Sequence, residues 1–196
     1  MKNLLTYMLL ALFSLSFQPG SGNVRWVVTT GCSLKVDGST NVNQFTCNIP
    51  NYSIPDTIFV SRTAAGGVQL QGSIRPEVLH FDCHMKAMTD DLRKTLKAKQ
   101  YPRMTIRFLS LSQYPTAVMK QNILTGQVLI ELAGVTQRYE VNYNVLAAND
   151  NTVHLIGTRQ VRFTDFKIDP PRKLGGLIRT DNDLSVVFSL RVKVLD

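Results

Sequence analysis

The chain lacks the short motifs that mark the commonest catalytic and metal sites. It has no Gly-x-Ser-x-Gly elbow, no Walker-type phosphate loop and no helical His-Glu-x-x-His zinc motif. His80 and His84 lie four residues apart in a segment that alternates like a strand, where four residues span about 13 Å. That span is too long for one zinc ion, whose ligands sit about 2 Å away. We therefore expect no catalytic residues, no metal and no enzyme activity.

Long runs of charge are also absent, although the chain is basic. Its formal net charge is +8, yet no run of five or more like charges occurs. Scattered basic residues are typical of a solvated surface, so we expect no nucleic-acid partner, while transient contact with an anionic membrane surface remains possible. There is no internal repeat, no low-complexity tract and no sign of a second domain in the 196 residues, which suffice for one domain.

The N-terminus resembles a targeting segment. A short positive start with Lys2 precedes an apolar run over residues 4–17, and small, turn-prone residues follow at 18–22. This order is typical of a secretory signal peptide, and the run is shorter than the ~20 apolar residues of a membrane-spanning helix. We expect residues 1–22 to be the signal peptide, residues 23–196 to form one domain, and the mature protein, beginning between Phe17 and Val24, to be periplasmic or secreted. An uncleaved anchor is the alternative.

Residues 124–145 predict a long antiparallel hairpin. In its second half Tyr139, Val141, Tyr143 and Val145 alternate with polar residues, which indicates a strand with one buried and one wet face. Gly134 separates the two runs, as a tight turn requires. Long hairpins of this kind build curved sheets and barrels.

Further strands are predicted by the same alternation, and one helix interrupts them. The strands are expected near residues 26–36, 42–49, 68–73, 78–85, 104–109, 153–163 and 184–194, with mostly loop at 50–67. A helix is expected over residues 89–100, with Thr89 as its N-cap and Tyr101-Pro102 ending it. Leu92 and Leu96 share one face of that helix and should point inward.

Several segments, in order and spacing, resemble the YceI-like family of secreted lipid-binding proteins. They cover residues 33–42, 88–102, 124–136 and 157–178, including Thr164-Asp165-Phe166 and Pro170-Pro171. The early segment departs from commoner members, because it carries cysteines and lacks a His-Ser pair often found in the first strand. The resemblance implies an all-β fold: an eight-stranded antiparallel lipocalin-like barrel with one short helix near one end and an isoprenoid-type lipid in the lumen.

Inward-facing apolar residues are the candidate walls of that lumen. Burial of each methylene is worth about 0.8 kcal/mol, so such walls could hold a polyisoprenoid, quinone or fatty acid without covalent chemistry or another cofactor. The candidate wall residues are Leu34, Phe45, Leu79, Phe81, Met85, Met88, Ile106, Phe108, Val128, Ile130, Tyr139, Val141, Leu155, Phe188 and Leu190. Arg159 interrupts an otherwise apolar strand face, so it either points inward to bind a ligand head group or turns to solvent at a strand end.

Three cysteines allow at most one disulfide within a monomer. Phe45-Thr46-Cys47 and Phe81-Asp82-Cys83 share the same spacing, so both cysteines should face the same interior. In an oxidising compartment a bridge can form, and we favour Cys47–Cys83. A Cys32–Cys47 bridge and three reduced, buried thiols are the alternatives.

The sequence therefore predicts a periplasmic or secreted carrier, monomeric or homodimeric, that sequesters an isoprenoid or other long-chain lipid in a barrel. The alternative is a filled barrel that contacts an envelope protein or a membrane surface and holds no small molecule. A co-purifying lipid would distinguish the two.

Overall fold

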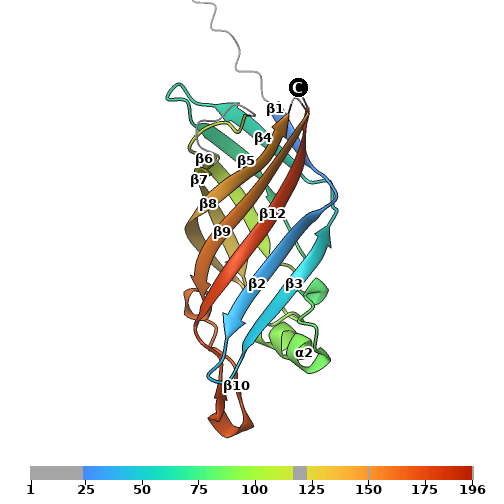
Figure 1. Ribbon diagram of the computed structural model, residues 1–196, viewed down its shortest axis with the longest axis vertical. Helices are drawn as coiled ribbons and strands as arrows, with labels where there is room; N and C mark the ends of the chain where they lie inside the picture. Colours follow the sequence, from blue (N-terminus) through green and yellow to red (C-terminus); the bar gives the residue numbers. More distant parts are fainter. Residues whose placement is uncertain (1–23, 117–122, 150, 196) are drawn as a thin grey trace, which may run out of the picture.

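The structure is a computed structural model that describes residues 24–116, 123–149 and 151–195. The predicted signal peptide lies outside the described residues. Most of the described chain is β-strand, as Figure 1 shows. The strands of the main sheet are β1 (Val24–Val28), β2 (Cys32–Ser39), β3 (Gln44–Tyr52), β4 (Thr57–Arg62), β5 (Val68–Ile74), β6 (Thr105–Leu111), β7 (Ile123–Leu132), β8 (Val135–Asn149), β9 (Thr152–Arg162) and β12 (Asp183–Leu195).

Eight of these strands close into an antiparallel barrel, as the sequence predicted. The order β1-β4-β5-β6-β7-β8-β9-β12 returns to its start because β1 pairs with both β4 and β12. Trp26 of β1 lies opposite Ile58 on one side and Val194 on the other. Closure leaves these strands without a free sheet edge at this end of the barrel.

The remaining two strands, β2 and β3, extend one wall of the barrel. β2 pairs with the first half of β12, below the point where β1 pairs with the second half, so β1 and β2 act as one strand broken at residues 29–31. β3 pairs with β2, and β4 with β1, in the same way. No described strand pairs with the other edge of β3, so the barrel wall has a gap there.

A non-sheet segment fills this gap. It contains the 3-10 helix η2 (Val78–His80) and the helix α2 (Lys86–Thr95), which lies beside β3 near the lower end in Figure 1. The segment is tied to β3 by a disulfide between Cys47 and Cys83, and Asn48 and Asp82 exchange two backbone hydrogen bonds of 2.8 and 2.9 Å. The covalent and hydrogen-bonded links fix α2 against the open half of the barrel.

The closed end of the barrel is filled by side chains. Trp26 and Ile58 are fully buried there, and Leu124, Leu155, Leu190 and Val192 are nearly so. Alternation explains this packing, because each strand sends every second residue to the interior. The empty space of the barrel therefore lies at the other end, behind β2, β3 and α2.

Three sequence predictions about local structure were wrong. Residues 78–85 are not a strand: η2 is followed by an extended segment that pairs with β3 only at Asp82. The expected loop at 50–67 contains β4. The helix spans Lys86–Thr95 instead of 89–100, because Met85 is the N-cap and Thr89 is buried within the helix, where its hydroxyl accepts a hydrogen bond from the Cys83 amide at 3.0 Å.

Beyond β9 the chain leaves the barrel and returns. The 3-10 helix η3 (Phe163–Phe166) leads to a small hairpin of β10 (Arg172–Lys173) and β11 (Ile178–Arg179), with the turn η4 (Leu174–Gly176) at its tip. The hairpin projects from the lower end in Figure 1. Within the described ranges, no helix combines the length and the hydropathy needed to cross a bilayer.

Candidate ligand pocket

An apolar pocket occupies the half of the barrel next to α2. Its walls come from β2, β3, β6, β7, β8, β9 and β12. Leu92 of α2 and Leu96, the C-cap residue of that helix, close the side where the wall has its gap. The inward orientation predicted for these two leucines is thus confirmed. The other lining residues are Leu34, Val36, Phe45, Cys47, Phe81, Met104, Ile106, Val128, Ile130, Leu132, Val141, Tyr143, Gly157, Arg159, Val161, Arg162, Phe163, Phe166, Leu184, Val186 and Phe188.

The pocket has a volume of about 100 Å³. A cavity of about 150 Å³ holds one benzene molecule, so by comparison this space admits about four carbon groups. Its lining surface is almost wholly carbon, and cavities of that kind stay dry or take apolar guests. The pocket therefore suits a segment of hydrocarbon chain.

Two glycines leave room for aromatic rings at the pocket wall because they have no Cβ. A Cβ at Gly38 would lie 2.4 Å from the Phe45 ring, so the glycine gives that ring its place at the pocket wall. A Cβ at Gly157 would lie 2.8 Å from the ring of Tyr143, a buried residue that also lines the pocket. Burial raises the pKa of Tyr143, so its phenol is neutral at physiological pH.

A polar cluster borders the pocket where β9 ends. The Tyr139 hydroxyl donates a hydrogen bond of 2.8 Å to the Asp165 carboxylate, and the Arg162 guanidinium forms a salt bridge of 3.0 Å with the same carboxylate. Asp165 also accepts the Arg162 backbone N–H at 3.1 Å, which completes a capping box at the start of η3. Arg162 is therefore already neutralised by a carboxylate within its own chain.

Arg159 differs from Arg162 in its partners. Its guanidinium lies over the Tyr139 ring, 5.5 Å from the centroid, while the residue lines the pocket and remains exposed to solvent. Among the described residues no carboxylate lies within salt-bridge distance of Arg159. The side chain is thus a cation at the pocket rim, neither fully inward nor turned away from the pocket.

The charges of this cluster affect its titration. Burial by itself would raise the pKa of Asp165, but hydrogen bonds from Tyr139 and Arg162 outweigh burial and hold that pKa below its ordinary value. Burial and the neighbouring Asp165 both raise the pKa of Tyr139. Asp165 is therefore ionised and Tyr139 neutral at physiological pH.

Comparison with known proteins returns matches to solved structures alone, since no protein-family model and no curated sequence matches the chain. A polyisoprenoid binding domain from Saccharophagus degradans, implicated in plant cell wall breakdown, aligns with a TM-score of 0.64 at 14% identity, over 87% of this chain and 98% of that one. BcnA of Burkholderia cenocepacia aligns with a TM-score of 0.60 at 16% identity, over 82% and 95% of the two chains.

The YceI protein of Campylobacter jejuni aligns with a TM-score of 0.51 at 13% identity, over 72% of this chain and 82% of its own. This chain has the YceI fold. The resemblance found in the sequence is thereby confirmed for the architecture, the closed eight-stranded barrel with one helix.

Within the YceI fold, the predicted wall residues fall into three groups. Eight line the pocket: Leu34, Phe45, Phe81, Ile106, Val128, Ile130, Val141 and Phe188. Five more pack into the protein but do not line the pocket: Met88, Phe108, Tyr139, Leu155 and Leu190. Both groups follow from alternation, which identifies an inward residue but not the level of the barrel at which it lies.

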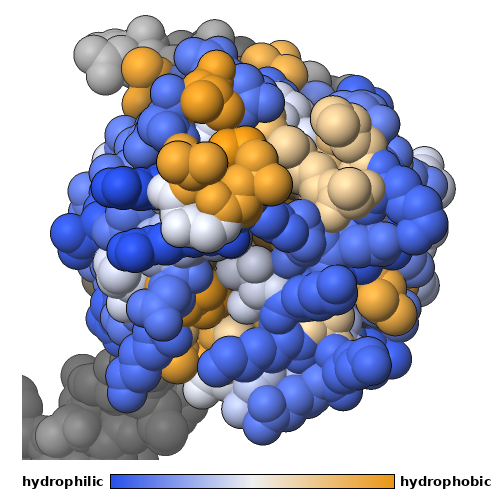
Figure 2. All heavy atoms as spheres, turned by 90° about the horizontal axis from the view of Figure 1, so that it is seen from below, coloured by the Kyte–Doolittle hydropathy of each residue, from blue (hydrophilic) through white to orange (hydrophobic). Residues whose placement is uncertain are grey.

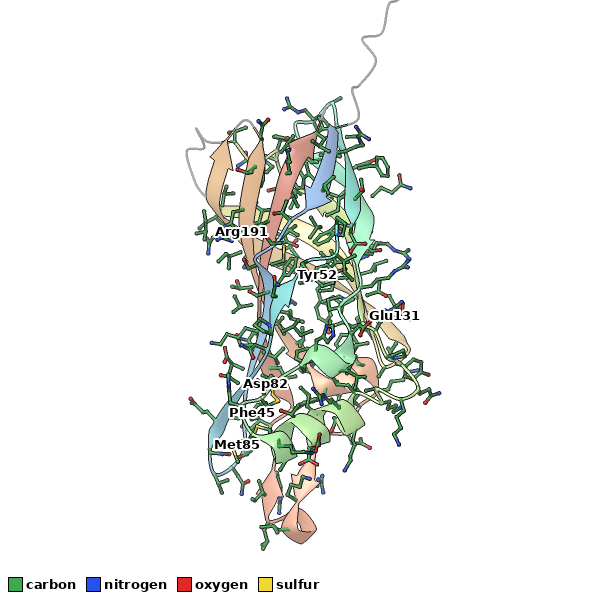
Figure 3. The ribbon with its side chains drawn as sticks, turned by 90° about the vertical axis from the view of Figure 1, so that its right-hand side faces the viewer. Phe45, Tyr52, Asp82, Met85, Glu131 and Arg191 are labelled. Atoms are coloured by element: carbon green, nitrogen blue, oxygen red, sulfur yellow. A yellow bond between two sulfur atoms is a disulfide. The ribbon has the colours of Figure 1, made fainter. Side chains whose placement is uncertain are left out.

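The third group is a correction. Leu79 and Met85, expected to face inward with Phe81 and Cys83, have exposed fractions of 52% and 61%. The 3-10 turn at Val78–His80 shifts the phase of the chain before Phe81, and the left-handed backbone at His84 (φ 62°) shifts it again before Met85. Figure 3 shows Met85 beside α2, near the labelled Phe45 and Asp82.

Some pocket residues were missed although the sequence carried a signal for them. Val36 lies two positions from Leu34, and Leu184 and Val186 alternate with Phe188, so the same period-two pattern marks all of them. Phe166 belongs to the Thr-Asp-Phe segment but follows the strand, where alternation gives no orientation. It turns toward the pocket because η3 is a tight helical turn.

The cysteines adopt the pairing favoured from the sequence. Cys47 and Cys83 are joined, and Cys32 is free and buried. The Cys32 sulfur accepts a hydrogen bond of 3.2 Å from the Arg191 backbone N–H. Burial raises the pKa of this thiol, so it is protonated and unreactive at physiological pH.

Proposed function

We propose that the protein is a YceI-like carrier that holds part of an isoprenoid or other long-chain lipid in its barrel, in the periplasm or outside the cell. The observation that carries the proposal is the apolar pocket of about 100 Å³ with a cation, Arg159, at its rim. The pocket would take hydrocarbon, and the guanidinium would take a negatively charged or carbonyl-bearing head group.

Burial of the chain supplies the affinity in this proposal. About four methylene groups inside the pocket, at about 0.8 kcal/mol each, give about 3 kcal/mol before the cost of association. A longer lipid leaves the rest of its chain outside or widens the half of the barrel that lacks strand pairing at β3. The polyisoprenoid binding domain of Saccharophagus degradans, which shares this fold, supports an isoprenoid as the first ligand to test.

A binding role is favoured over catalysis by the lining itself. Among the described lining residues the polar groups are the Arg159 and Arg162 guanidiniums and the Tyr143 hydroxyl, and the Cys47 sulfur is held in the disulfide. These groups include no activated nucleophile with a neighbouring base. The pocket is suited to holding a molecule without changing it.

Native mass spectrometry of protein purified from its own source tests the carrier role. A lipid that co-purifies and leaves on denaturation supports the proposal. A protein that emerges lipid-free, and binds no prenyl or acyl lipid when challenged, refutes it in favour of a filled interaction module. N-terminal sequencing of the same sample tests export: a start between Phe17 and Val24 is expected, and a start at Met1 contradicts it.

Arg159→Met tests head-group recognition. The substitution should weaken an anionic or quinone-headed lipid by about 1.5–3 kcal/mol, the range for a hydrogen bond to a charged group, and barely affect a plain hydrocarbon chain. Arg138→Met is the matched control, because Arg138 is exposed on β8 and bonds to Gln127 instead of lining the pocket. Equal losses for both ligand types, or none, would remove Arg159 from the site.

A further inference from the structure

Three exposed apolar side chains gather at the lower end of the molecule. Leu177, Leu174 and Val42 have exposed fractions of 75%, 71% and 65%, the highest of the large apolar residues that the structure describes. We call these three residues the apolar tip. Figure 2, which views this end from below, shows a protruding hydrophobic area with hydrophilic atoms on one side and moderately hydrophobic atoms on the other. Exposed apolar side chains that cluster in one place, unlike those scattered singly, are typical of an interaction surface.

The apolar tip is held in place by its backbone. It joins two loops, the β2–β3 turn and the β10–β11 turn, that are far apart in the sequence. The Asn41 amide side chain donates to the Leu177 carbonyl at 2.9 Å and its carbonyl accepts from the Arg179 N–H at 2.8 Å. The turn between the leucines runs through Gly175 and Gly176, both with positive φ, so no bulky side chain covers them. The turn that carries Leu177 is thus tied to the β2–β3 turn, and both leucines are exposed.

The hairpin that carries the two leucines of the apolar tip has charged residues of one sign. Residues 172–179 contain Arg172, Lys173 and Arg179 and no acidic residue. Lys173 has a salt bridge of 2.5 Å to Asp91 of α2. Arg172 and Arg179 lie directly opposite each other in the β10–β11 ladder, and among the described residues neither has a carboxylate within salt-bridge distance. Like charges placed opposite each other destabilise a hairpin unless an anion lies between them.

We propose that this end of the protein docks on an anionic lipid bilayer. The apolar tip enters the acyl boundary, and the guanidiniums of Arg172 and Arg179 bind lipid phosphates at the head-group level. A projecting pair of leucines between basic side chains is complementary to an anionic membrane, in which apolar acyl chains lie beneath negatively charged head groups.

Docking in this orientation would place the pocket next to the bilayer. Val42 lies three residues before Phe45, and β11 leads within a few residues to Leu184, and both Phe45 and Leu184 line the pocket. A lipid could then pass between membrane and pocket with little of its chain in water. Transfer of lipid between the membrane and the pocket rests on the proposed function, whereas docking on the membrane does not.

Vesicle binding by paired variants tests the proposal. The protein is purified in the form that cells release and sedimented with vesicles of phosphatidylcholine, with or without about one third phosphatidylglycerol. Replacing Leu174 and Leu177 by serine should weaken binding to anionic vesicles about tenfold or more, since each leucine loses its burial. Replacing Arg172 and Arg179 by glutamine should weaken it about fivefold per residue, and about 30-fold together.

The opposite end of the barrel supplies matched controls. Ile123 and Leu146 are each 59% exposed at the ends of β7 and β8, and Arg25 and Lys193 are exposed on β1 and β12. Ile123→Ser with Leu146→Ser, and Arg25→Gln with Lys193→Gln, should leave vesicle binding unchanged. Equal losses in the control pairs and the tip pairs would show binding without this orientation and overturn the proposal.

A second readout reports insertion directly. In Leu177→Trp the new indole should shift its emission to shorter wavelength with anionic vesicles, while the native Trp26 is fully buried and should not change. Absence of a shift, or binding by the tip variants as strong as that of the unmodified chain, overturns the proposal. Lipid that co-purifies with these variants, measured by native mass spectrometry, reports on the carrier role separately and should be retained.

Discussion

Replacing Cys47 and Cys83 together by alanine is expected to lower the free energy of unfolding by about 4 kcal/mol. The bridge closes a loop across 36 positions of sequence, and the chain-entropy relation for a loop of that length gives about 3.8 kcal/mol at 25 °C. A domain of this size is stable by only about 5–15 kcal/mol. The loss would therefore be a large fraction of the total.

The structure also says where the loss would appear. The bridge holds the η2–α2 segment on β3, where two backbone hydrogen bonds between Asn48 and Asp82 also link them. The Arg93 guanidinium donates to the Leu79 and Phe81 carbonyls, so it ties α2 to η2 within the segment and not to β3. Without the bridge, hydrogen exchange in α2 should speed up more than in β12, since local opening of the segment needs fewer broken contacts. Pocket affinity should fall with it, because Leu92 and Leu96 line the pocket.

Urea denaturation of the double variant, the unmodified protein and Cys32→Ala measures the effect. Cys32 is equally buried but free, so its truncation should cost only about 1 kcal/mol, which separates the bridge from the loss of buried sulfur. Non-reducing peptide mapping of the unmodified protein should link Cys47 to Cys83. A bridge that includes Cys32, or a double variant no less stable than Cys32→Ala, would refute this reasoning.

Three further predictions concern single side chains. Burial lowers the pKa of His154, so the unfolded state binds more protons as pH falls; stability should drop between about pH 7 and pH 5, and His154→Gln should flatten that slope in pH-dependent denaturation. Gly38→Ala should cost about 1–3 kcal/mol because its Cβ collides with an aromatic ring, whereas Gly67→Ala, whose nearest contact would be the Thr63 hydroxyl at 3.3 Å, should cost less in the same thermal melts. Tyr139→Phe should cost about 1.5–3 kcal/mol by removing the bond to Asp165 and raise the pKa of that carboxyl, which NMR titration would measure; an unchanged pKa contradicts the contact.

The strands of the barrel could be predicted where one face is buried and the other is exposed to solvent, because apolar and polar residues then alternate in the sequence. β12 was predicted to within one residue at each end, and β8 was predicted from its start but ends four residues later than expected. β4 was missed even though Ile58 and Val60 alternate with exposed neighbours, because Pro50 and Pro55 suggested a loop on both sides. Short strands between prolines carry too few repeats to reveal their period.

The pocket could be predicted only in part, for a different reason. Period two says that Leu34 and Leu190 both face inward, but it carries no information on height along the barrel. One lines the pocket and the other packs in the closed end. Height depends on the stagger between strands, which is set by pairing across the whole sheet. Arg159 shows the same limit, since its place at the rim depends on where β9 ends.

The unpaired edge of β3 has a consequence for self-association. An open strand edge is a template on which a strand of another chain can add, and proteins with such edges risk aggregation. Here Asp82 already occupies both the N–H and the carbonyl of Asn48, and the neighbouring Cys47 anchors that cover covalently. In a reducing environment the cover would be held by non-covalent contacts alone. The same cysteine pair that stabilises the fold would then also keep one molecule from extending the sheet of the next.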